Sequence, residues 1–65
     1  MGEIKIGDTF KNFKGETHKV IRISKTGLVL TCKNIETDEI VKFRFYVASG
    51  RYFKENSVVD LGELL

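Results

Sequence analysis

The sequence predicts an all-β domain, a small antiparallel meander of about five strands that curls into a barrel. Three runs of alternating apolar and polar residues lie within residues 17–46, separated by two short polar turns. Alternation with a period of two is typical of strands that bury one face. With 65 residues in total, residues 1–65 form a single domain without room for a second core. A flat sheet of this size is marginally stable in water, so short strands favour a sheet that curls on itself.

The first third of the chain predicts one short strand and a turn. Residues 1–7 alternate weakly, with Ile4 and Ile6 on one side, and form either a short edge strand or an ordered lead-in. In residues 8–13, strict alternation places Phe10 and Phe13 on opposite faces, so burial of both requires a bulge. The pair Lys14-Gly15 predicts a turn, because glycine adopts positive φ readily.

Residues 17–24, 28–34 and 39–46 are predicted to be the three central strands, because they are rich in β-branched and aromatic residues. Alternation predicts that His18, Val20, Arg22 and Ser24 point outward, and that Lys19 shares the other face of its strand with two isoleucines. The predicted inner wall consists of Ile21, Ile23, Leu28, Leu30, Cys32, Val41, Phe43 and Phe45.

The region after residue 46 has a weaker pattern. Residues 47–50 predict a loop or a single helical turn, and Tyr52 and Phe53 are expected to fold back as a lid over an open end of the sheet. Residues 57–61 are compatible with a last short strand. The final pair, Leu64-Leu65, is apolar and is expected either to tuck into the domain or to meet a partner.

A stretch near the start carries a resemblance to a known class of domain. Residues 6–15, IGDTFKNFKG, followed by residues 18–21, HKVI, resemble the start of small bacterial SH3-like proteins, in particular a family of uncharacterised domains. The resemblance covers about the first third of the chain and implies an SH3-like barrel, but almost no function. The small size and the lack of enzyme motifs are also similar to accessory proteins of phages and mobile elements. The alternatives are an OB-like barrel or a curled β-sheet with one short helical turn.

The residues that usually carry catalysis do not combine into a site. Cys32 is predicted to point inward and His18 outward, so they should diverge rather than act as nucleophile and base. A single cysteine and a single histidine provide neither a disulfide nor a zinc cluster, and the acidic turn of residues 35–39 lacks the pattern of a calcium loop. We therefore expect a non-enzymatic protein without cofactor or metal. The lone cysteine fits a reducing compartment, and with no apolar run near the ~20 residues of a membrane span, the expected location is cytoplasmic.

The positive charges are segregated along the chain. Residues 42–54 hold four basic residues and no acid, and residues 11–33 hold six basic residues and one acid. On an antiparallel sheet this pattern predicts a basic outer face with neighbouring tyrosines. The candidate binding residues are Arg22, Lys33, Lys42, Arg44, Tyr46, Arg51, Tyr52 and Lys54. Such a face suits the phosphate backbone of nucleic acid or an acidic host or partner protein, and it is also a common solvated surface.

Two further readings remain open. An adaptor for a partner protein would use a groove of aromatic residues, for which the candidates are Phe10, Phe13, Tyr46, Tyr52 and Phe53. A homodimeric structural or regulatory protein would need no nucleic-acid contact and would bury Val58, Val59, Leu61, Leu64 and Leu65. The sequence thus predicts a binding module that docks on a partner protein or on nucleic acid, with the homodimer as the alternative.

Overall fold

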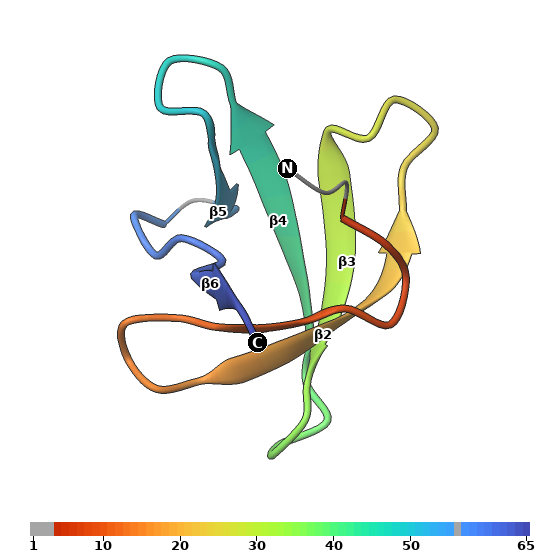
Figure 1. Cartoon of the computed structure of the whole chain (residues 1–65), viewed down its shortest axis with the longest axis vertical. Coiled ribbons are helices and arrows are strands. Elements are labelled where there is room, and N and C mark those ends of the chain that lie inside the picture. The colour runs from red at the N-terminus through yellow and green to blue at the C-terminus, as the bar shows by residue number, and fades with distance from the viewer. Residues whose placement is uncertain (1–3, 56) are drawn as a thin grey trace.

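Six strands form a single antiparallel sheet in the computed structural model, which describes residues 4–55 and 57–65 (Figure 1). The strands are β1 Thr9–Lys11, β2 Thr17–Ile23, β3 Val29–Asn34, β4 Ile40–Tyr46, β5 Arg51–Lys54 and β6 Glu63–Leu64. Their order in the sheet is β5-β4-β3-β2-β1-β6, so consecutive strands from β1 to β5 are neighbours. The predicted all-β meander is confirmed, with six strands rather than about five. The described residues include no helix, and therefore no helix that could span a membrane.

The sheet curls into a half-barrel, and the last residues of the chain span its open side. The segment of residues 59–65, here named the C-terminal strap, lies between β5 and β1 (Figure 1). At one end the Lys54 N–H donates to the Val59 carbonyl (2.8 Å), and the Leu61 N–H donates to the Tyr52 carbonyl (2.9 Å). At the other end the Leu65 N–H donates to the Thr9 carbonyl (2.9 Å). The strap therefore covers both edges of the sheet, which would otherwise expose unpaired backbone groups.

The core lies on the concave side of the half-barrel. Leu30, Cys32, Val41 and Phe43 are buried there, as their alternation predicted. The other buried apolar residues are Phe10, Val20 and Leu61, with Ile4, Ile23 and Tyr52 packed against the cluster. Phe10 is buried, whereas Phe13 is 75% exposed in the turn after β1, so the bulge that burial of both rings would require is not needed.

A β-bulge in β2 overturns part of the predicted inner wall. Val20 pairs with Cys32, but Arg22 pairs with Thr31, so one extra residue, Ile21, interrupts the register. His18 and Val20 are therefore buried, and the prediction that they point outward is wrong. Ile21 is 39% exposed, and its predicted inward position is also wrong. Beyond the bulge, the side chains of β2 again point as the sequence predicted: Arg22 is exposed and Ile23 packs against the core.

Other predictions fail at strand ends. Leu28 is 47% exposed because β3 begins one residue later, at Val29. The expected lid of Tyr52 and Phe53 is strand β5, paired in register with β4. The expected strand at residues 57–61 contributes only one bridge, between Phe53 and Asp60. Residues 47–50, in contrast, form the predicted turn, in which the Gly50 N–H donates to the Tyr46 carbonyl (2.8 Å), the hydrogen bond of a single helical turn.

The N-terminal lead-in contains no strand among residues 4–7, and the expectation for residues 1–3 lies outside the described residues. The Gly7 N–H donates to the Val20 carbonyl (2.8 Å), and the Val20 N–H donates to the Asp8 carbonyl (2.8 Å). These two bonds hold the lead-in against β2, and Ile4 packs on the core. Of the two readings, the ordered lead-in is therefore the correct one for the described part.

Candidate functional site

The strand register places a set of basic side chains on the outer, convex face of β2, β3 and β4. Residues opposite each other on neighbouring strands share a face of the sheet. One row across the three strands is Lys19, Lys33 and Ile40, and the next is Arg22, Thr31 and Lys42. A third row joins Val29, Arg44 and Phe53 on β3, β4 and β5. The basic face is defined by Lys19, Arg22, Lys33, Lys42 and Arg44.

Two more candidate residues lie at the end of this face, and two lie elsewhere. Tyr46 pairs with Arg51, and both follow the outward alternation of β4 and β5. Tyr52 pairs with Phe45 on the opposite face, where its hydroxyl donates to the Gly27 carbonyl (2.7 Å). Lys54 pairs with Phe43, so it also follows the concave side of the register, although it is exposed. The prediction that Tyr52 and Lys54 share the basic face is therefore wrong.

Lys19 belongs to the basic face, although the sequence placed it on the inner side. The bulge after Val20 inverts the predicted phase of this part of β2. A signal was present in the sequence, because a lysine on an inner wall conflicts with the strong tendency of lysine to stay exposed. Lys19 stands directly opposite Lys33, and like charges in that position repel each other. The carboxylate of Asp38, which pairs with Lys33, partly offsets this repulsion.

The ion pairs leave most of the basic face unneutralised. Lys33 Nζ lies 3.2 Å from Asp38 Oδ1, and Arg51 Nε lies 2.9 Å from Asp60 Oδ2. Within residues 4–55 and 57–65, the other four cations of the basic face have no carboxylate at ion-pair distance. Glu55 lies beside the basic face, where it lines a hollow with Lys42 and Arg44, and its backbone N–H donates to the Lys42 carbonyl (3.2 Å).

Apolar side chains lie between these cations. A shallow groove on the outer face has a floor of Ile21, Val29 and Ile40, with Arg22 and Lys42 at its rim. Both Ile21, in the bulge of β2, and Ile40, at the start of β4, are exposed. The outer face therefore offers positive charge and apolar contact in the same place.

An aromatic pair closes one end of the outer face. The rings of Tyr46 and Phe53 are perpendicular, with their centroids 5.6 Å apart. They line a mainly apolar hollow, here named the aromatic hollow, together with Ala48, Ser49, Ser57 and Val58. The predicted groove of five aromatics does not form, because Phe10 and Tyr52 face the concave side and Phe13 lies in the β1–β2 turn.

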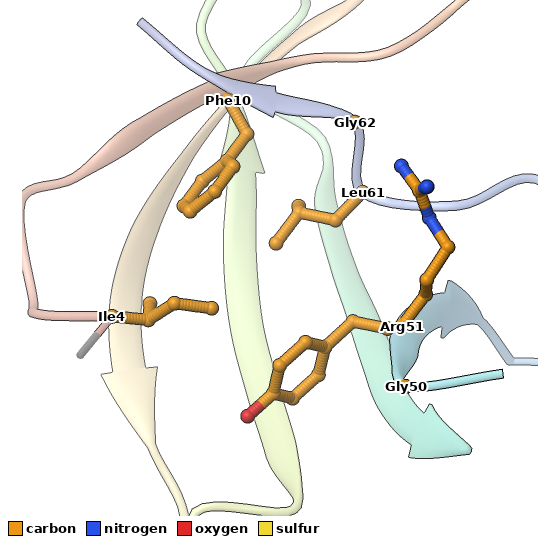
Figure 2. A pocket seen from close by; sticks show the side chains of 7 residues that line it. Ile4, Phe10, Gly50, Arg51, Leu61 and Gly62 are labelled. Atoms are coloured by element: carbon orange, nitrogen blue, oxygen red, sulfur yellow. The ribbon is translucent and has the colours of Figure 1, made fainter. Parts of the chain in front are cut away.

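The concave side offers a second hollow, between the strap and the N-terminal lead-in (Figure 2). Figure 2 shows Ile4, Phe10 and Leu61 pointing into it from three different segments. Arg51, although outward in the register of β5, also borders this hollow, because its side chain extends toward the strap and its guanidinium is paired there with Asp60. This hollow therefore provides apolar contact that completes the core, and little that could recognise a polar ligand.

His18 and Cys32 are both buried on the concave side, so the prediction that they diverge is wrong. His18 pairs with Asn34 and packs edge-on against Phe43, with ring centroids 5.2 Å apart. Its Nδ1 is buried and has no hydrogen-bond partner among the described residues, and burial lowers the pKa of His18. Burial also raises the pKa of the Cys32 thiol to about 12. A neutral, inaccessible thiol is a core residue rather than a nucleophile.

The metal-binding residue types do not gather in the described part of the chain, where no group of three His, Cys, Asp or Glu side chains could hold an ion. The acidic turn after β3 is organised instead by Asn34, whose Oδ1 accepts from the Glu36 N–H (2.9 Å) and the Thr37 N–H (3.2 Å).

Comparison with protein-family models, with curated proteins and with solved structures gives no match for this chain. The fold confirms the general expectation from the resemblance near the N-terminus, because the chain forms a small curled antiparallel sheet.

Proposed function

We propose that this protein is a non-enzymatic binding module that contacts the phosphate backbone of nucleic acid through the basic face. The observation that carries the proposal is the gathering of five cations on three adjacent strands, four of them without a carboxylate partner among the described residues. The half-barrel also supports placing the domain among SH3-like barrels, which serve many unrelated binding functions.

The spacing of the cations suits a polyanion. Lys42 and Arg44 are two residues apart on one strand, so their Cα atoms are about 7 Å apart. Arg22 and Lys42 stand on strands separated by β3, about 10 Å apart. Since these distances do not exceed the Debye length of about 10 Å at 0.1 M salt, the potentials of the side chains overlap. A chain of phosphates would meet several of them at once.

The groups between the cations favour nucleic acid over an acidic protein surface. A phosphate chain carries flat bases, and the exposed Ile21, Ile40 and Tyr46 offer apolar and aromatic surface to them. A dimer through the basic face would bring like charges together. The apolar C-terminal residues predicted for the alternative dimer interface do not all remain available, because Leu61 is buried in the core of its own chain.

The test is fluorescence anisotropy of a labelled oligonucleotide titrated with the protein at low salt. Reversal of two charges, in the double variant Arg22→Glu with Lys42→Glu, should abolish binding. The matched control is Lys5→Glu with Lys25→Glu, which changes the net charge equally but lies in the lead-in and in the β2–β3 turn. Equal loss in both variants would refute a specific role for the basic face, and absence of binding by the unaltered protein would refute the proposed function.

A further inference from the structure

The aromatic hollow is built differently from the rest of the outer face. Tyr46 ends β4, Phe53 belongs to β5, and Val58 precedes the strap, so three segments converge on it. The two serines at its border have hydroxyls that serve the backbone. The Ser49 hydroxyl donates to the Tyr46 carbonyl (3.2 Å) and the Ser57 hydroxyl accepts from the Val59 N–H (3.1 Å). The polar groups at the border are thus engaged, and the walls that face outward are apolar.

The hollow is open to solvent rather than part of the core. Tyr46 is 45% exposed and Val58 is 86% exposed, while the perpendicular rings hold each other in place. Two rings at right angles present one ring face and one ring edge to the same space, and a flat aromatic group can stack on the first while it contacts the second. The chemistry of the hollow therefore suits a flat, apolar-faced ring.

The charges beside the hollow indicate what such a ring would be attached to. Arg44 stands opposite Phe53 in the register, so the Cβ atoms of these two residues are about 5 Å apart. Arg51, opposite Tyr46, is already paired with Asp60. Arg44 has no such partner among the described residues and is continuous with the basic face. A ligand that carries both a flat ring and a phosphate could therefore contact the aromatic hollow with the ring and Arg44 with the phosphate.

We infer that the aromatic hollow is a nucleobase-stacking subsite, and that the nucleic acid this protein binds is therefore single-stranded. The inference rests on the proposed function of the basic face. In a duplex both faces of each base are covered by neighbouring bases, so only an unpaired base can enter the hollow. Stacking accepts any base, so the subsite selects strandedness rather than sequence.

The experiment compares three probes of equal phosphate number on the full chain: a single-stranded DNA, a duplex of half its length, and an abasic sugar–phosphate oligomer as long as the single strand. The single strand should bind roughly 5- to 150-fold more tightly than the abasic oligomer, the range expected for one stacked base. The variant Tyr46→Ala should lose most of this preference for the single strand, and Tyr46→Phe should keep it. The control Phe13→Ala removes an aromatic that is even more exposed than Tyr46 but lies in the β1–β2 turn, and it should change nothing.

The outcomes separate the two levels of the proposal. Equal affinity of the unaltered protein for all three probes, with a strong effect of Arg22→Glu and Lys42→Glu, would overturn the stacking subsite and leave the proposed function intact. No binding of any probe would overturn both. Competition by polyglutamate as effective as competition by the single strand would show recognition of negative charge alone, and would also overturn the inference.

Discussion

Replacement of Gly62 by alanine should open the half-barrel. Gly62 is the point at which the strap passes from β5 to β1, and its φ is 95°. A Cβ at this position would overlap the Lys11 carbonyl and lie 2.6 Å from the Asn12 Cα. Both neighbours belong to the backbone, so no side chain can move aside to make room. We expect Gly62→Ala to displace the strap from β1.

The size of the effect follows from what the strap contributes. A positive φ alone costs an alanine about 1–2 kcal/mol. Displacement of the strap would also expose Leu61, which is buried, at about 2 kcal/mol. Backbone hydrogen bonds such as that from Leu65 to Thr9 add about 1 kcal/mol each. The sum is about 4–6 kcal/mol, against a total of roughly 3–10 kcal/mol for a domain of this size.

Urea unfolding followed by far-UV circular dichroism measures this loss, with Gly27→Ala as the matched control. Gly27 also has a positive φ, 76°, but open space surrounds the position of its Cβ. The free energy of unfolding of the control should therefore fall only by what a positive φ costs an alanine, about 1–2 kcal/mol. If both variants lose the same free energy of unfolding, the strap does not close the sheet through Gly62 and the reasoning is refuted.

Two predictions concern the buried groups of the concave side. Cys32 should react with a thiol reagent in the native protein only as fast as the protein unfolds, and at once in denaturant, because its side chain is buried and its pKa is raised to about 12; rapid reaction of the native protein would contradict this burial. For His18, burial lowers the folded-state pKa below the ordinary value of 6.5, so the unfolded chain binds the proton more readily. Stability should be complete above about pH 6.5 and should fall as the pH drops from there toward the lower folded-state pKa. Urea midpoints at pH 7.5 and pH 5.5 measure the loss, which should be smaller in His18→Phe; an unchanged pH dependence in that variant would exclude His18 as the cause.

The central strands were predictable because their evidence is local. Residues such as Val41 and Phe43 alternate without interruption in β4, and both are buried as predicted. Lys19 on the predicted inner wall signalled an irregularity in β2, but the position of the bulge at Ile21 was not predictable, because it is defined by the register with β3. Because of this one extra residue, the residues of β2 that precede it, including His18 and Lys19, were assigned to the wrong face of the sheet.

The C-terminal part depends on contacts between distant segments. The strap joins β5 to β1 through residues about fifty positions apart in the chain, and a single sequence carries no sign of such pairing. The same reason explains the candidate site. Arg22, Lys42 and Arg44 were placed together correctly by alternation, whereas Tyr52 was misplaced because β5 had no predicted register.

The salt dependence of binding to a single-stranded oligonucleotide tests the central proposal most directly. If the basic face contacts three to five phosphates, the logarithm of the association constant should fall linearly with the logarithm of salt concentration, with a slope of roughly −2 to −3.5. The measurement uses the unaltered protein and anisotropy between 25 and 200 mM salt, about the range in which such contacts are released. A slope in that range supports phosphate contact by the basic face. A flat response would contradict it.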